Sequence, residues 1–172
     1  MYARNATLPD AFAIEQLIQV HVGDGTLLPR SLSEICENIR DFAVIEHEGE
    51  IVGCGALHLY GMHLAEVRSI TIGSKAKGQG AGRVLIDALL AEAQRQSVTC
   101  VCLFTRIPDF FAKMGFQTVE KEALPDKIHK DCLKCPRIHA CDEIAMYMGE
   151  LPEYTPRPRF IANERLLVQI AT

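Results

Sequence analysis

The chain has 172 residues, of which 48% are hydrophobic and 23% are charged, with 12 glycines and 8 prolines. This size and usage predict one globular domain and exclude fibrous, collagenous and wholly disordered chains. The 18 Lys and Arg residues against 22 Asp and Glu residues give a net charge of −4, which offers no overall basic field to nucleic acid or anionic lipid. Any anionic ligand must therefore be held by local groups.

Hydropathy and the number of cysteines indicate the cellular compartment in which the protein works. The longest uncharged run, residues 51–65, contains glycines and histidines and is shorter than the roughly 18 apolar residues that a membrane span needs. Residues 1–10 lack the basic and apolar regions of a secretion signal. Seven cysteines are an odd number in a chain large enough to fold without disulfides. We therefore expect a protein of the reducing cytoplasm that binds neither membranes nor nucleic acid.

The first forty residues predict a short strand and two helices. Residues 2–6 suit a strand, and residues 7–10 then have the spacing of a capping box with a proline in the first turn. The helix that follows ends at the glycines near residue 25. Residues 31–34 repeat the capping pattern before a second helix that ends near Arg40. The apolar positions expected to bury the first helix are Phe12, Ile14, Leu17 and Ile18.

The middle of the chain predicts a sheet with two further helices. A hairpin, a central strand and a glycine-rich turn precede a strongly amphipathic helix, and a buried strand, a short helix and a last strand follow it. In chain order these elements are expected at residues 42–47, 51–60, 65–72, 80–96, 99–104, 109–114 and 116–119. The apolar side of the long helix is expected to hold Val84, Leu85, Ala88, Leu89 and Ala93.

The pattern weakens after Lys121. A loop-rich stretch with three cysteines leads to an apolar run at residues 144–148, a proline-bearing linker at residues 151–158 and a predicted strand at residues 166–170. This tail is too short to be a domain. We expect one domain over residues 1–172, with a core at 2–119 and a cysteine-containing tail at 120–172 packed on it.

The glycine-rich turn between the central strand and the long helix is the most informative segment. Its glycines let the backbone approach a ligand, and the free amides at the start of a helix suit a pyrophosphate. Lys75, Lys77 and Arg83 add positive charge there. The segment lacks the Gly-Lys-Ser/Thr of a Walker loop, and the hairpin before it argues against a dinucleotide fingerprint. A plain glycine-rich turn remains the alternative.

Two motifs together resemble the GNAT acetyltransferases. Residues 77–82, Lys-Gly-Gln-Gly-Ala-Gly, look like the family's acetyl-CoA motif with Lys in its first place, and residues 110–116 look like its second signature, a helix that ends in Gly-Phe. The resemblance covers residues 2–119 and implies an α+β fold with a mixed central sheet flanked by helices. It also implies acetyl-CoA as co-substrate, lying in a gap beside the central strand. The contacts implied are Ile70, Ile72, Lys77, Gly78, Gln79, Gly80, Ala81, Gly82 and Arg83.

Closer matching narrows the resemblance to the short N-acetylglutamate synthases. These enzymes lack the amino-acid-kinase domain of the long synthases, for which this chain has no room. The resemblance implies acetylation of the α-amino group of glutamate at the start of arginine biosynthesis. The matching stretches are residues 25–31, 52–57, 66–69, 103–106 and 160–168.

The resemblance assigns roles to four residues. Glu66, on the central strand, matches the general base, which an attacking amine requires; its alternative role is an ion pair with Arg68. Arg30 and Arg106 match the arginines that bind the substrate carboxylates, as planar guanidinium groups do well; their alternative is solvated surface arginines. Leu28 matches a residue whose carbonyl receives the substrate amine. Arg68 is a further substrate-binding candidate.

One position departs from the family pattern. Many GNAT enzymes have a Tyr before the Gly-Phe signature, thought to protonate the CoA thiolate, and this chain has Phe111. Either another group or water must then protonate the thiolate, or the thiolate leaves unprotonated. Thr105 and Asp109 are candidates that the sequence does not rank. Cys54 as a covalent acetyl carrier is disfavoured because a strand cysteine is usually a small buried hydrophobe.

The tail cysteines allow several interpretations. Cys132, Cys135 and Cys141, with His129 and His139 nearby, have a spacing that suits one structural zinc ion. A strong zinc signal has two C-x2-C pairs, and this tail has one. Free cysteines or one disulfide are therefore the favoured alternative. An iron–sulfur cluster is the remotest option, since a fourth local cysteine is missing.

The sequence thus favours an acetyl-CoA-dependent N-acetyltransferase that uses glutamate. The first rival is a GNAT enzyme for another amino acid, a polyamine or a protein N-terminus. The second is a non-catalytic CoA-binding or metal-sensing module, in which Phe111 marks lost chemistry. The sequence leaves the oligomeric state open, a homodimer included.

Overall fold

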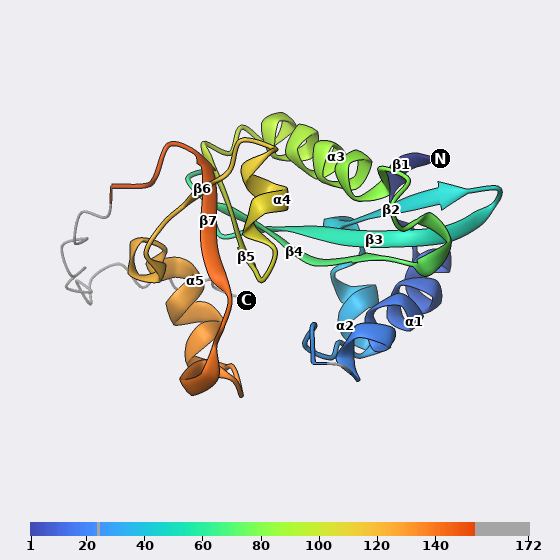
Figure 1. The fold of residues 1–172 in the computed structure, drawn as a ribbon, viewed down its shortest axis with the longest axis horizontal. Coiled ribbons are helices and arrows are strands. Elements are labelled where there is room, and N and C mark those ends of the chain that lie inside the picture. Colours follow the sequence, from blue (N-terminus) through green and yellow to red (C-terminus); the bar gives the residue numbers. More distant parts are fainter. Residues whose placement is uncertain (24, 154–172) are drawn as a thin grey trace, which may run out of the picture.

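The computed structural model describes residues 1–23 and 25–153 and contains a seven-stranded mixed sheet flanked by helices (Figure 1). The strand order is β1-β2-β3-β4-β5-β7-β6, and every neighbouring pair is antiparallel except β4 and β5. The strands are β1 (Tyr2–Asn5), β2 (Phe42–His47), β3 (Glu50–Leu59), β4 (Ala65–Ile72), β5 (Cys100–Thr105), β6 (Gln117–Thr118) and β7 (Ile144–Gly149). The helices are α1 (Ala11–Val22), α2 (Leu32–Glu37), α3 (Ala81–Arg95), α4 (Pro108–Ala112) and α5 (Pro125–Lys130).

Helices α1 and α2 cover one face of the sheet. The predicted capping box before α2 is present, because the Ser31 hydroxyl accepts from the Glu34 amide and the Glu34 carboxylate accepts from the Ser31 amide. Helix α2 ends at Glu37 and a separate 3-10 turn follows, so the expected end near Arg40 is three residues too late. Ile14 and Ile18 are buried on α1 as predicted. The prediction for Phe12 is wrong, because this side chain is 59% exposed.

Helix α3 covers the opposite face (Figure 1). Leu85 and Leu89 are buried as predicted, and Gly55 on β3 lets them approach, since a Cβ there would lie 3.2 Å from Leu89. The prediction for Val84 is wrong: it is 38% exposed, and Ile86 is fully buried in its place. The buried stripe thus keeps Leu85, Leu89 and Ala93 of the expected positions and includes Ile86 in place of Val84.

Strands β4 and β5 pair for two positions and then separate. The parallel register joins Ala65 to Val101 and Glu66 to Cys102, and no later pair is formed. Beyond this point β4 has a bulge against β3, at which Ser69 adopts a positive φ of 54°. A bulge bends and twists a strand, and a positive φ in a non-glycine residue is strained, which is typical of functional sites. The gap that the sequence resemblance implied beside the central strand is therefore confirmed.

The tail extends the same sheet. Strand β7 lies between β5 and β6, so the apolar run at residues 144–148 forms a central strand. Helix α5 was not predicted; it begins at Pro125, and Leu124 before it is fully buried. The strand predicted at residues 116–119 is confirmed as the shorter β6. The strand predicted at residues 166–170 lies outside the described residues.

Two glycines with positive φ test the packing of the tail. Gly149, at the end of β7, has a φ of +98°, and a Cβ there would lie 2.2 Å from the Thr99 carbonyl oxygen. Gly49, in the β2–β3 turn, has a φ of +80° with nothing within 4 Å of a Cβ. We expect Gly149→Ala to lower the free energy of unfolding by more than about 2 kcal/mol and Gly49→Ala by about 1 kcal/mol. Urea denaturation measures both, and equal losses would contradict the close approach of β7 to Thr99.

Candidate active site

The separation of β4 and β5 opens a cleft of about 290 Å³. We use the word cleft for this cavity, which the loop before α2, the strands β4 and β5 and the tail line together. Five residues predicted for the site line it: Leu28, Arg30, Glu66, Ile70 and Arg106. Ile72 and Lys77 instead line a separate cavity of about 400 Å³ between α1 and the ends of β3 and β4. The six further predicted co-substrate contacts, residues 78–83, line neither cavity.

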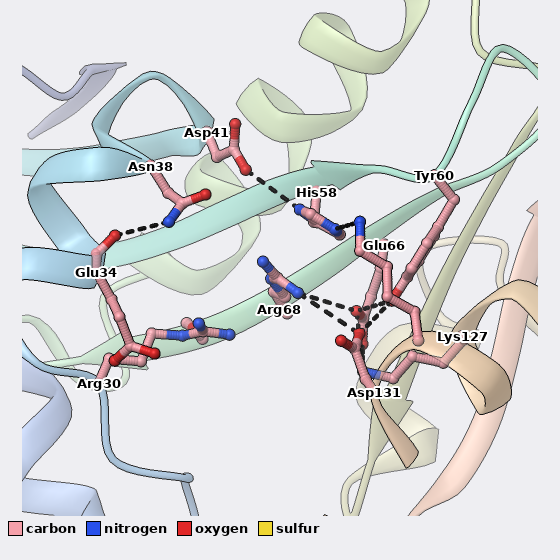
Figure 2. A network of polar contacts seen from close by, with 12 residues as sticks. Arg30, Glu34, Asn38, Asp41, His58, Tyr60, Glu66, Arg68, Lys127 and Asp131 are labelled. Atoms are coloured by element: carbon pink, nitrogen blue, oxygen red, sulfur yellow. Dashed lines mark hydrogen bonds and ion pairs between the residues drawn. The ribbon is translucent and has the colours of Figure 1, made fainter. Parts of the chain in front are cut away.

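Glu66 is the buried acid of the cleft. Its residue exposure is 3%, and its carboxylate accepts hydrogen bonds from Lys127 Nζ at 2.8 Å and from the Tyr60 hydroxyl at 2.9 Å (Figure 2). The predicted alternative, an ion pair with Arg68, is also present, at the longer distance of 3.9 Å. A buried carboxylate needs such partners, because an unpaired charge in the interior is costly.

Helix α5 brings two residues to Glu66 that the sequence did not suggest. Lys127 contacts Glu66, and Asp131, just after the helix, accepts from Lys127 Nζ at 3.2 Å and from the Tyr60 hydroxyl at 2.6 Å. Arg68 Nη1 lies 3.6 Å from Asp131. Lys127 and Arg68 thus offset the charges of the two carboxylates. The i, i+4 spacing of Lys127 and Asp131 indicates a helical pair, but no signal in the sequence places that pair beside β4.

Arg30 faces the same site from the loop before α2. Its Nε donates to the hydroxyl of Ser69 at 2.9 Å, so the bulge of β4 fixes the orientation of the guanidinium group. Burial and the neighbouring charge of Arg68 lower the pKa of Arg30. Among the described residues no carboxylate forms an ion pair with Arg30, although Glu34 lies near it (Figure 2). A partly buried cation in this state favours an anionic ligand.

Arg106 has protein partners in the structure. Its Nε donates to the Asp142 carboxylate at 2.7 Å, and its Nη1 donates to the Thr26 carbonyl at 3.1 Å. Arg137 donates to the neighbouring Gly25 carbonyl. These two arginines hold the loop before α2 against the tail. The role of Arg106 toward a substrate stays a prediction.

The glycine-rich turn has the geometry expected for binding an anion. Gly78 and Gly80 have φ values of +79° and +82°, and a Cβ on either would meet nothing within 4 Å. Gly80 is the N-cap of α3, no side chain caps the helix, and the first helical bond runs from the Val84 amide to the Gly80 carbonyl. The amides of Ala81, Gly82 and Arg83 precede that bond and have no acceptor in the helix. This end of α3 suits a phosphate group.

Phe111 and Thr105 also line the cleft. Phe111 is 3% exposed and packs edge-to-face with Phe110 and Phe116, so a hydrocarbon ring stands where the family pattern has a phenol. Thr105 lines the cleft and its hydroxyl accepts from the Ile107 amide, whereas Asp109 is not among the lining residues. Burial raises the pKa of the Cys54 thiol to about 12, which removes its nucleophilic form at neutral pH.

The structure does not support the predicted zinc site. Across residues 1–23 and 25–153, no three His, Cys, Asp or Glu side chains are grouped so that they could hold a metal ion. Cys132, Cys135 and Cys141 are free and half-buried, and Lys121 Nζ lies 3.1 Å from the Cys141 sulfur. The C-x2-C spacing was misleading because the 3-10 turn at Cys132–Lys134 orders the segment with backbone hydrogen bonds.

No helix in the described part of the chain is long and apolar enough to cross a membrane.

The Glu66–Lys127 pair can be tested by removing the lysine charge. Lys127→Met leaves two carboxylates with one fewer cation, so we expect the free energy of unfolding to fall by about 3 kcal/mol and Tm by roughly 6–12 °C. Lys113→Met, on an exposed side chain, is the matched control and should change stability by less than about 0.5 kcal/mol. Calorimetry gives both values. Equal melting temperatures for the two variants would mean that the pair does not stabilise the fold.

Comparison with known proteins identifies the family. Residues 38–118 match the model of the acetyltransferase (GNAT) domain. The chain is 41% identical over 143 residues to an uncharacterized N-acetyltransferase of Chlorobaculum tepidum, an alignment that covers 83% of this chain and 92% of that protein. It is 29% identical over 168 residues to an amino-acid acetyltransferase of Mycobacterium tuberculosis, with coverage of 96% and 92%.

Solved structures agree. The Mycobacterium tuberculosis protein Rv2747, in complex with CoA and NLQ, superposes with a TM-score of 0.76 at 28% identity, covering 88% of this chain and all of that one. An N-acetylglutamate synthase of Neisseria gonorrhoeae, complexed with coenzyme A and N-acetyl-glutamate, gives the same TM-score at 25% identity. The second match covers 88% of this chain but 35% of the synthase. The chain belongs to the GNAT acetyltransferases and is similar to those that acetylate amino acids.

Proposed function

We propose that this protein transfers the acetyl group of acetyl-CoA to the α-amino group of L-glutamate. The observation that carries the choice of substrate is Arg30, a partly buried guanidinium group in the cleft with which no described carboxylate forms an ion pair. A dicarboxylate amino acid supplies the anion that this group lacks. The names of the amino-acid acetyltransferase and N-acetylglutamate synthase relatives support the same substrate class.

The charge of the cleft favours an anionic substrate over a polyamine. Five cationic side chains line it against three acidic ones. Asp142 pairs with Arg106, and Lys127 and Arg68 offset Glu66 and Asp131, which leaves Arg30 and Arg137 against Glu143. A cationic substrate would add charge to this excess, whereas glutamate reduces it. The cationic residues are Arg30, Arg68, Arg106, Lys127 and Arg137, and the acidic ones are Glu66, Asp142 and Glu143.

The residues present suit acetyl-CoA as the donor. The gap beyond the Glu66–Cys102 pair leaves the β4 backbone without a strand partner on that side, which suits the pantetheine arm. The uncapped start of α3 suits the pyrophosphate. We propose that backbone amides of β4 polarise the thioester carbonyl, as oxyanion stabilisation requires.

Glu66 is the proposed general base. An α-ammonium group must lose a proton before its nitrogen attacks the thioester carbon, and Glu66 is an acidic side chain of β4 that lines the cleft. Collapse of the tetrahedral intermediate breaks the C–S bond and releases a second proton from the nitrogen. That proton balances the departing thiolate, so the reaction needs no side-chain acid at Phe111. N-acetylglutamate and CoA are the products, which would place the enzyme in arginine biosynthesis.

The substrate assignment predicts a selective kinetic defect. With purified protein, acetyl-CoA and a panel of amino acids, polyamines and short peptides, mass spectrometry should show N-acetylglutamate as the dominant product. Arg30→Ala should raise the KM for glutamate at least about tenfold and leave the KM for acetyl-CoA within about twofold, because it removes binding to one substrate alone. Arg40→Ala, on a surface 3-10 turn, is the control that should change neither value.

Other outcomes identify the alternatives. Dominant acetylation of a cationic amine, or equal effects of Arg30→Ala on both KM values, would refute the substrate assignment while keeping the fold. CoA binding without turnover of any amine would favour the non-catalytic module that Phe111 suggested.

A further inference from the structure

The hydroxyl of Tyr60 lies between two carboxylates. Tyr60 Oη is 2.9 Å from Glu66 Oε2 and 2.6 Å from Asp131 Oδ2 (Figure 2). A phenol has one hydrogen to donate, so it cannot satisfy two ionised carboxylates at once. A hydroxyl in this position can instead receive a proton from one carboxylic acid as it passes its own to the other carboxylate. The geometry is that of a two-step proton transfer.

The proposed reaction creates a need for such a transfer. An ammonium substrate and a thioester yield an amide, a thiol and one free proton, and this free proton is the one that Glu66 takes. Glu66 must release it in every cycle. The Glu66 side chain is 4% exposed, and bound substrates would fill the cleft that it faces. The Asp131 side chain is 30% exposed, and Asp131 is not among the residues that line the cleft, so it can exchange a proton with water.

The charges around the hydroxyl favour transfer in which no phenolate forms. Burial, together with the charges of Glu66 and Asp131, raises the pKa of Tyr60. Burial alone would raise the pKa of Asp131, but the hydrogen bond from Tyr60 and the charges of Lys127 and Arg68 outweigh it and lower that pKa. Asp131 is thus a group that passes a proton on to water.

Other groups pack around Tyr60 without interrupting the path. Lys130 Nζ lies 5.4 Å from the centre of the Tyr60 ring, and the His58 ring packs edge-to-face on it at 5.0 Å. His58 also contacts Asp41 through Nδ1 and Lys130 through Nε2; its contact with Asp41 is drawn in Figure 2. Cys102 on β5 stays a neutral thiol, because burial and the Glu66 charge raise its pKa. None of these groups lies between Tyr60 and the two carboxylates.

We propose that Tyr60 and Asp131 form the path by which the proton accepted by Glu66 leaves for solvent while the cleft is occupied. The inference rests on the proposed function only in requiring an ammonium substrate. The proton moves from Glu66 to the Tyr60 oxygen as the Tyr60 proton moves to Asp131, and Asp131 then releases it to water. Helix α5 thereby serves the chemistry, with Lys127 as a positioning residue that holds both carboxylates.

The test is the steady-state kcat for acetyl transfer, measured by mass spectrometry in mixtures of H2O and D2O, because Glu66 must release its proton before each further turnover. In the wild type, a path with two protons in flight predicts a curved dependence of the rate on the deuterium fraction. Tyr60→Phe removes the hydroxyl and keeps the ring. It should slow transfer at least about tenfold and make the dependence linear, with both substrate KM values within about twofold of wild type. Asp131→Asn should slow transfer similarly.

The control is Tyr147→Phe, whose hydroxyl bonds Gln117 on the exposed side of β7 and which should match the wild type. If Tyr60→Phe fails to fold, Asp131→Asn decides the matter. An unchanged rate, or a slower rate that keeps the curved dependence, would overturn the path while leaving the proposed function intact. Absence of turnover with every amine would overturn both. Turnover of an amine other than glutamate would refute only the substrate, since the proton balance is the same.

Discussion

The short pairing of β4 with β5 is the constraint on which the rest of the site depends. Two parallel pairs, Ala65 with Val101 and Glu66 with Cys102, hold the strands together at one end. The bulge at Ser69 then bends β4 away, and its positive φ of 54° shows that the backbone departs from a regular strand. The cleft opens directly beyond the last pair. Glu66 therefore stands where the sheet ends its continuous hydrogen bonding and the cavity begins.

A buried acid at that point requires compensating charge, and the tail supplies it. Within residues 120–149, β7 extends the sheet beyond β5, and helix α5 lies in the same segment beside β7 (Figure 1). Lys127 then reaches Glu66, and Asp131 reaches Tyr60. The tail is thus as much part of the site as the core is. Because the two carboxylates share one lysine and one phenol, a change at either affects the other.

Sequence reasoning succeeded where the signal was local or family-wide. Capping boxes, the apolar run of β5 and the glycines before α3 each have a period or spacing of their own. Arg30, Glu66 and Arg106, singled out by the resemblance to the short synthases, line one cleft. Sequence reasoning failed where contacts between distant parts of the chain decide the surroundings of a residue. Phe12 has helical spacing but faces solvent, and Lys127 and Asp131 look like solvated helix charges until the sheet order is known. The C-x2-C pair has the spacing of zinc ligands, but in the described part of the chain no third side chain joins it to form a metal site.

A structure of the protein with CoA and N-acetylglutamate bound is the most direct test of the account. We predict that the pantetheine arm lies between β4 and β5, that its pyrophosphate meets the amides at the start of α3, and that a carboxylate of N-acetylglutamate contacts Arg30 with the acetylated nitrogen nearest Glu66. CoA bound outside the β4–β5 gap, or N-acetylglutamate bound without contact to Arg30 and with its nitrogen away from Glu66, would contradict it.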